Sequence, residues 1–223
     1  MTTPRKRRAN GEESRRKILA AAAEIAGERG YDGTSISAVS ERSGLPASSI
    51  YWHFANKDEL IAAVIRDSFE RWRSLMSAEL DRDRDDSSDP RTQLTDSMRQ
   101  NGRAVVEAPD FLRLGLMLTL ERRPKEPAAR TLFLGVRDEA RSAAQALYQR
   151  IFGDTLTETD TATLALMAVA ATDGLFIARE VDGDALDTDL AFELIGVALN
   201  AVAEHLQSRR APSTPRRPQR TNG

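Results

Sequence analysis

The chain has 223 residues, of which 40% are hydrophobic and 30% charged, and its formal net charge is −2. That length is enough for one large domain or two small ones with a hydrophobic core. No apolar run is long enough to span a bilayer and no export signal is recognisable, so we expect a cytoplasmic protein that does not enter a membrane. The absence of cysteine excludes disulfides, thiolate zinc sites and cysteine nucleophiles, and there are only two histidines. We therefore expect no catalytic residue, no metal and no cofactor.

Positive charge gathers at the two ends of the chain. Residues 1–17 hold seven basic side chains against two acidic ones, and residues 209–223 hold five arginines and no acid. Such asymmetry favours local contact with a polyanion, since the remaining body is acidic. We expect residues 1–12 to form a disordered basic arm and residues 209–223 a disordered basic tail. The arm either follows a phosphate ridge or stays solvated.

The periodicity of apolar residues predicts helices along the whole chain and no β hairpins. A first helix over about 13–29 buries one apolar stripe and ends at Gly30. Two short helices follow within residues 34–54, and a longer one starts near Lys57, with Asn56 as its cap. Proline and glycine breaks separate five further predicted helices, at about 91–107, 110–122, 126–152, 159–180 and 188–208.

Residues 34–54 have the pattern of a helix-turn-helix. Gly44 supplies the turn, and Ile50 and Phe54, four residues apart, fix the inner face of the second helix. The outer face of this helix is uncharged, so it can approach phosphates and base edges without a large desolvation cost. Hydroxyl, indole and imidazole groups make up that face, at Ser48, Ser49, Tyr51, Trp52 and His53. The alternative is that the aromatic residues are half-buried on an ordinary helical surface.

The stretch from Gly30 to Leu60 has the pattern G-Y-x-x-T-S-I-x-x-V-x-x-x-x-G-L-x-x-x-x-I-Y-x-H-F-x-x-K-x-x-L. It resembles the DNA-binding domain of TetR/AcrR-type (tetracycline-repressor-like) transcriptional regulators. The resemblance implies an N-terminal three-helix helix-turn-helix DNA-binding domain, here residues 13–58. It further implies a C-terminal helical domain for effector binding and dimerisation, residues 59–208, and thus an all-α chain of about nine helices.

The resemblance also implies which residues contact DNA. Thr34 and Ser35 would start the helix that meets the DNA backbone. The residues that would bind phosphates are Tyr51, His53 and Lys57. The residues that would face the major groove are Ala47, Ser48, Ser49 and Trp52. These groove-facing positions lack Arg, Gln and Asn, which are the strongest direct readers of bases. We therefore expect specificity to come from Trp52, the serines, water and DNA shape.

Residues 161–181 and 190–206 are apolar almost all round. A helix of this kind is buried on more than one side or lies in a membrane. Asp173, Glu193 and Asn200 argue against the membrane, so we expect the two helices to form a two-fold four-helix bundle with a second subunit. The resemblance implies the same homodimer. Two-fold symmetry then requires a palindromic DNA operator whose half-sites lie one helical turn, about 34–36 Å, or more apart.

The resemblance implies an effector pocket enclosed by residues 91–152. The candidate residues of its wall are Met98, Phe111, Leu114, Met117, Leu118, Phe133, Arg137, Met167 and Asp173. Ordinary core packing is the alternative for each apolar one. Arg137 and Asp173 interrupt apolar stripes, and a buried charge must be paired, so we expect them to pair within the protein unless they bind the polar end of a ligand.

We interpret the chain as a ligand-responsive transcriptional regulator. In this hypothesis a homodimer represses by binding an operator in double-stranded DNA, and an unidentified small-molecule effector releases it. One alternative is a DNA-binding activator or architectural protein without an effector. Another is a small-molecule enzyme on a helical scaffold, which the lone His205 and the absence of cysteine disfavour.

Overall fold

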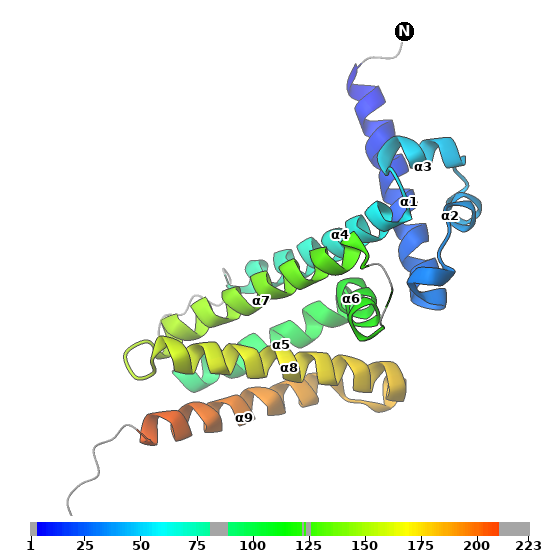
Figure 1. Cartoon of the computed structure of the whole chain (residues 1–223). Coiled ribbons are helices and arrows are strands. Elements are labelled where there is room, and N and C mark those ends of the chain that lie inside the picture. Colours follow the sequence, from blue (N-terminus) through cyan, green and yellow to red (C-terminus); the bar gives the residue numbers. More distant parts are fainter. Residues whose placement is uncertain (1–3, 81–88, 122, 124–125, 210–223) are drawn as a thin grey trace, which may run out of the picture.

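The computed structural model of the chain describes residues 4–80, 89–121, 123 and 126–209. Over these ranges it contains nine α-helices, one short 3-10 helix and no strand, which confirms the predicted all-α fold (Figure 1). The helices are α1 (Pro4–Gly33), α2 (Ile36–Ser43), α3 (Ala47–His53), α4 (Lys57–Leu80), α5 (Pro90–Glu107), α6 (Asp110–Leu120), α7 (Ala128–Phe152), α8 (Glu158–Asp182), η1 (Gly183–Ala185) and α9 (Thr188–Ser208). Apart from Arg209, the predicted basic tail lies outside the described residues.

Helix α1 begins at Pro4 rather than near residue 13. The prediction of a disordered arm is therefore wrong for residues 4–12. Proline suits a first helical turn, and the arginine, lysine, alanine and glutamate residues that follow have good helix propensity. The predicted break at Gly30 is confirmed, because this residue has a φ of 70° and a ψ of −179° and turns the chain between two helical segments.

Helices α1, α2 and α3 form a small head at one end of the molecule, and α4 leads from this head into a larger helical body (Figure 1). In that body α5, α7, α8 and α9 are long neighbouring helices, while α6 lies between the body and the head. Helix α4 packs on α1, α5, α6 and α7. It therefore contacts both parts of the molecule.

The buried apolar side chains form two separate cores. The first joins the head to α4, α6 and the beginning of α7, and its largest fully buried side chains include Phe69 and Phe133. The second joins α5, the end of α7, α8 and α9, and includes Tyr148 and Phe192. The body is thus not packed around a single centre, and the boundary between its two cores runs through α5, α7 and α8.

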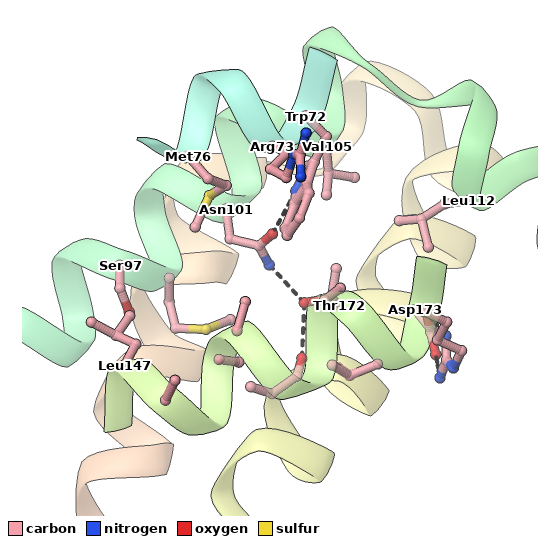
Figure 2. Close-up of a pocket in the computed structure, with 18 of the residues that line it drawn as sticks. Trp72, Arg73, Met76, Ser97, Asn101, Val105, Leu112, Leu147, Thr172 and Asp173 are labelled. Atoms are coloured by element: carbon pink, nitrogen blue, oxygen red, sulfur yellow. Dashed lines mark hydrogen bonds and ion pairs between the residues drawn. The ribbon is translucent and has the colours of Figure 1, made fainter. Parts of the chain in front are cut away.

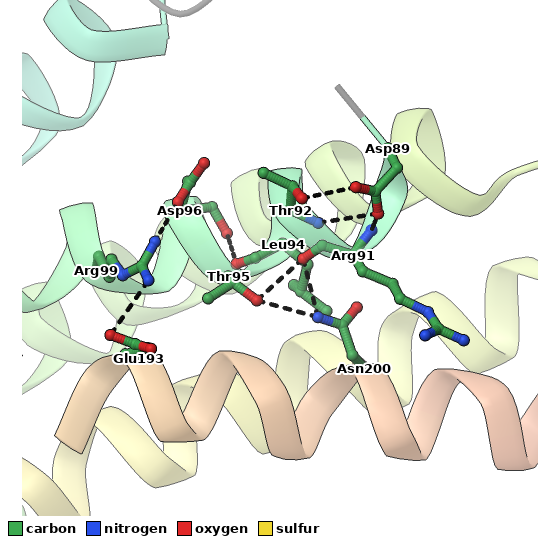
Figure 3. A network of polar contacts seen from close by, with 10 residues as sticks. Asp89, Arg91, Thr92, Leu94, Thr95, Asp96, Arg99, Glu193 and Asn200 are labelled. Atoms are coloured by element: carbon green, nitrogen blue, oxygen red, sulfur yellow. Dashed lines mark hydrogen bonds and ion pairs between the residues drawn. The ribbon is translucent and has the colours of Figure 1, made fainter. Parts of the chain in front are cut away.

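Polar contacts hold α9 against α5 (Figure 3). The Asn200 side-chain amide donates to the Arg91 carbonyl oxygen at 2.9 Å and to Thr95 Oγ1 at 3.1 Å. One turn after this position Glu204 pairs with Arg91 at 2.7 Å, and two turns before it Glu193 pairs with Arg99 at 3.1 Å. The polar residues that interrupt the apolar pattern of α9 therefore bind α5.

Helices α8 and α9 also expose large apolar side chains to solvent. Each is 45% exposed or more: Leu166, Ile177, Val181, Leu190, Leu194 and Val197. We call these six residues the outer apolar face. Large apolar side chains exposed on two neighbouring helices favour an interaction surface. Helix α8 would also suit a membrane span by length and composition, but Asp173 at its centre is ion-paired with Arg137, which argues against that location.

Candidate nucleic-acid interface and interior cavity

The α2–turn–α3 segment is built as the sequence predicts. The Ser35 hydroxyl accepts from the Ala38 N–H at 3.2 Å and caps α2. Gly44 ends α2 with a φ of 68°, a left-handed conformation that favours glycine. Val39, Ile50 and Phe54 lie in the first core, so they fix the angle between the two short helices.

Two serines stabilise the turn between these helices. Ser40 Oγ donates to the Leu45 carbonyl oxygen at 2.7 Å, and Ser43 Oγ accepts from the Leu45 N–H at 3.3 Å. Both bonds end on one residue, which itself packs against the first core. The sequence interpretation did not assign these serines a role. Their signal is available in the sequence, because hydroxyl side chains beside a glycine turn commonly bond nearby backbone groups.

The outer face of α3 presents its aromatic side chains to solvent. Trp52 is 76% exposed and Tyr51 56% exposed. Ser48 is exposed beside them, while Ala47 and Ser49 are half-buried. The alternative of half-buried surface aromatics therefore fails for Tyr51 and Trp52, and α3 has an uncharged face that ends in large rings and small hydroxyls.

His53 lies at the end of the same helix and is half-buried. Its ring meets the edge of the Trp52 ring with centroids 4.5 Å apart. Burial, and secondarily the nearby Arg15 cation, lower the pKa of His53 below its ordinary value. The imidazole is therefore neutral at neutral pH, with one N–H available as a donor.

The remaining predicted contact residues differ in position. Ser35 is exposed at the start of α2. The Lys57 ammonium lies over the Tyr31 ring, 4.4 Å from its centre, and donates to the Tyr31 carbonyl oxygen at 3.1 Å. Thr34 is the exception, because its side chain is buried and its hydroxyl donates to the Gly30 carbonyl oxygen at 2.8 Å. Its side chain therefore shapes the turn after α1 and lies away from the outer face of α3.

A carboxylate at the start of α4, where that helix leaves the head, binds the beginning of α7. Asp58 accepts from the Ala128 N–H at 2.6 Å and from the Ala129 N–H at 3.1 Å. Helix α7 has Pro127 at its N-cap position with no side-chain cap of its own, so Asp58 satisfies its first amides from another helix. Burial and the same carboxylate raise the pKa of Tyr31. The beginning of α7 is thus tied to the residue beside Lys57.

A cavity of about 370 Å³ lies in the body between the two cores (Figure 2). Side chains from α4, α5, α6, α7 and α8 line it. Phe111 and Phe133 reach it from the first core, and Met98, Tyr148 and Ala168 from the second. The volume falls within the range of about 300–1,000 Å³ that is usual for small-molecule sites. The molecule therefore has a partly open cavity, large enough for a small ligand, where its two cores meet.

The structure brings five of the nine predicted wall residues to this cavity and four elsewhere. Met98, Phe111, Phe133, Arg137 and Asp173 line it. Leu114 and Leu118 lie in the first core instead, on the inner side of α6. Met117 is exposed near Gly30, and Met167 is exposed on α8. Apolar residues on one helix look alike in sequence, and only the positions of the neighbouring helices determine which of them face a void.

Arg137 and Asp173 form the ion pair that the sequence analysis expects. Arg137 Nη1 donates to Asp173 Oδ1 at 2.7 Å, and its second amino group contacts the other carboxylate oxygen. Such a two-point contact between a guanidinium and a carboxylate is among the stronger ion-pair geometries. Both residues line the cavity, so the pair contributes a charge-balanced segment of its wall.

The sequence interpretation did not identify a second polar group of the wall, which is centred on Asn101. The Trp72 indole N–H donates to Asn101 Oδ1 at 3.0 Å, and Asn101 Nδ2 donates to Thr172 Oγ1 at 2.8 Å. This chain of bonds crosses from α4 through α5 to α8 (Figure 2). The signal was present, because Asn101 interrupts the apolar stripe of Leu94, Met98 and Val105 just as Arg137 interrupts its own. Over the part of the chain that the structure describes, no cluster of His, Asp and Glu side chains could hold a metal ion.

The comparisons with known proteins agree with this geometry. The profile of the family "Bacterial regulatory proteins, tetR family" matches residues 18–64. Among curated proteins, the HTH-type transcriptional regulators TtgR and SrpR of Pseudomonas putida are 34% and 33% identical to the chain over 61 residues. That match covers 27% of this chain and only 29% of each relative.

Solved structures resemble the chain over most of its length. A transcriptional regulator from Rhodococcus sp. Rha1 superposes with a TM-score of 0.66 at 20% identity, covering 86% of this chain and 97% of that one. FadR from Bacillus subtilis, solved in complex with stearoyl-CoA, gives a TM-score of 0.64 at 15% identity and the same two coverages. At these identities the likeness is one of fold. The sequence match to the family "Bacterial regulatory proteins, tetR family" is therefore confined to the helix-turn-helix segment and the start of α4, and the resemblance over the rest of the chain is one of fold.

Proposed function

We propose that the protein is a cytoplasmic, ligand-responsive transcriptional repressor that binds a palindromic operator as a homodimer. The observation that carries this proposal is the outer face of α3. Large rings and small hydroxyls stand exposed there on a helix that is held rigidly by its buried side. This surface has no evident role in the stability of the fold, and it suits insertion into a DNA major groove.

Around α3, other groups are placed to bind phosphates. Ser35 lies at the start of α2, where helix N–H groups favour an anion. Lys57 uses one of its three ammonium donors on Tyr31, which leaves donors for a phosphate. Tyr51 and His53 supply a hydroxyl and an N–H on either side of Trp52. We assign phosphate contacts to Tyr51, His53 and Lys57 and groove contacts to Ala47, Ser48, Ser49 and Trp52.

The outer apolar face of α8 and α9 is the surface through which we propose that two copies associate. Its six large side chains come from two neighbouring helices, and the same patch on a second copy is its natural complement about a two-fold axis. The result would be a four-helix bundle. This symmetry carries two copies of α3 to two equivalent DNA half-sites.

Release by an effector follows from the position of the cavity. A ligand there contacts α4 at Trp72 and α7 at Phe133; α4 packs on the head, and α7 is bonded to the head-proximal end of α4 at Asp58. If the ligand favours a different separation of the two cores, it changes the placement of the head. Coupling of this kind usually amounts to about 1–3 kcal/mol, and a nearly complete switch requires about 5.5 kcal/mol.

Selection of random duplex DNA on the full-length protein, followed by a screen for small molecules that release the selected DNA, tests the proposal. We expect an enriched palindrome and at least one releasing compound. The Trp52→Ala variant should enrich a different sequence while it keeps the salt dependence of binding, because it loses a groove contact and no phosphate contact. Failure of every sequence to enrich at low salt would refute DNA binding. An enriched operator with no releasing compound would instead favour an activator or architectural protein.

A further inference from the structure

We propose that the cavity binds an uncharged, largely apolar molecule that contains a planar ring and one hydrogen-bonding group, and that the amide of Asn101 binds this group. The inference rests on the proposed function, since that function makes the cavity the effector site. It adds the chemical class of the effector and the residue that recognises it.

The charge balance of the wall supports an uncharged ligand. Arg137 and Asp173 neutralise each other through two contacts, so neither is left to pair with a charge on the ligand. Breaking that pair would leave a charge without its partner, which is strongly unfavourable. Two other arginines line the cavity from exposed positions, and of these Arg73 pairs with Glu70. A charged group buried beside the Arg137–Asp173 pair would therefore lose water without gaining a free counter-ion.

The hydrogen bonds of Asn101 leave part of its amide available. The indole N–H of Trp72 can only donate, so it must face Asn101 Oδ1, and Nδ2 then faces Thr172. The Thr172 hydroxyl donates to the Ala168 carbonyl oxygen at 2.8 Å and therefore accepts from Asn101. A primary amide has two N–H donors and two acceptor sites, so one of each remains for a ligand. Figure 2 shows this amide between α4 and α8 at the cavity.

An aromatic cluster forms the wall beside Asn101. The Trp72 ring stacks on Phe69 with centroids 5.4 Å apart, and Phe111 lies 5.8 Å from Trp72. Trp72 and Phe111 both line the cavity. Flat π surfaces favour offset or edge contacts with another ring, so this wall suits a planar ligand.

Two fluorescent probes that share one skeleton test the inference directly. N-phenylnaphthylamine is neutral, planar in part and has a single N–H, while anilinonaphthalenesulfonate is the same molecule with an added sulfonate. Both should be titrated into the full-length Trp52→Phe protein, where Trp72 is the remaining tryptophan. Quenching of Trp72 emission then reports binding next to Asn101. Binding of the selected DNA is measured in parallel on the unsubstituted protein, because Trp52 is itself assigned a groove contact.

We expect the neutral probe to quench Trp72 and to bind at least about tenfold more tightly than its sulfonate. Thr172→Val should weaken the neutral probe about three- to tenfold, because it removes the hydroxyl that orients the amide. Asn101→Ala should weaken it by at least as much. Thr163→Val is the matched control, since it makes the same change on an exposed part of α8 outside the cavity and should have no effect.

Three results would overturn the inference. The sulfonate could bind as tightly as the neutral probe, which would indicate an anionic ligand held by the exposed arginines, as an acyl-CoA would be. A second such result is that the neutral probe binds the Asn101→Ala and Thr172→Val variants as tightly as it binds their parent. A third is that neither probe quenches the emission of Trp72. In each case, DNA binding by the unsubstituted protein would leave the proposed function standing, whereas failure of the unsubstituted protein to bind DNA would contradict that function separately.

Discussion

The head and the body use apolar side chains in different ways. In the head, apolar residues fill a solid core, and the functional surface consists of the few aromatic and hydroxyl groups that remain outside it. In the body, apolar residues occupy three kinds of position. Some fill the two cores, some line the cavity between them, and some form the outer apolar face. The comparison shows that the proposed function of the head depends on the side chains that lie outside its core, on the outer face of α3. The proposed function of the body depends on the cavity between its two cores and on the outer apolar face.

The strongest test of this contrast replaces an outer apolar residue of the body by a charge. Leu194→Arg should abolish the dimer and reduce operator affinity more than a hundredfold, because it loses about 1.5–3 kcal/mol of burial on each subunit and adds like charges across the two-fold axis. Light scattering and a DNA-binding titration measure both effects. Leu134→Arg, an equally polar change at an exposed leucine of α7, is the control. Dimeric Leu194→Arg protein would show that the subunits associate elsewhere.

The next test concerns the outward groups of the head. Lys57→Ala should weaken binding to every DNA sequence about tenfold or more, since a hydrogen bond to a charged group contributes about 1.5–3 kcal/mol. It should also reduce the slope of log affinity against log salt by about one. Arg141→Ala, an exposed cation of the body paired with Asp138, should leave that slope unchanged. An unchanged slope for Lys57→Ala would count against its phosphate contact.

A third test separates the two regions without altering either site. Asp58→Ala removes the acceptor for the first amides of α7, at a cost to stability of about 0.5–2 kcal/mol. We expect the variant to retain operator binding and to bind a releasing compound, but to need a higher concentration of that compound for release. Titration of the compound against the protein–DNA complex, with its direct binding measured in parallel, distinguishes coupling from affinity. Release at the normal concentration would show that α4 alone transmits the effect.

The smallest expected effect lies in the turn of the head. Ser40→Ala removes the 2.7 Å bond to the Leu45 carbonyl oxygen and should lower stability by about 1 kcal/mol, which corresponds to about 2–4 °C in Tm for a chain of this size. Ser74→Ala on α4 is the matched control, because this exposed residue donates its hydroxyl to a carbonyl oxygen one turn back in its own helix. Both variants gain the same helix propensity, so the difference between them isolates the turn bond. Equal melting temperatures would mean that the turn does not depend on Ser40.

Sequence reasoning was most accurate where contacts are local. The two short helices within residues 34–54, the turn at Gly44 and the cap of α4 by Asn56 follow from spacings of a few residues, and the structure confirms them. It was least accurate at the N-terminus, where a run of basic residues suggested disorder although its helix propensity is good, and in the cavity wall. The ion pair between Arg137 and Asp173 was predicted because each charge interrupts an apolar stripe. Asn101 likewise interrupts an apolar stripe, but the sequence interpretation did not include it among the wall residues.

The amino-acid order by itself determined the set of helices and the helix-turn-helix, because helix periodicity, caps and glycine turns depend on neighbours within one or two turns. The tertiary structure decided the rest. It placed Asp58 at the start of α7, joined Trp72 to Thr172 through Asn101, and left a void between the two cores. These arrangements connect residues tens of positions apart, and whether an apolar side chain fills space or borders it depends on how the helices cross.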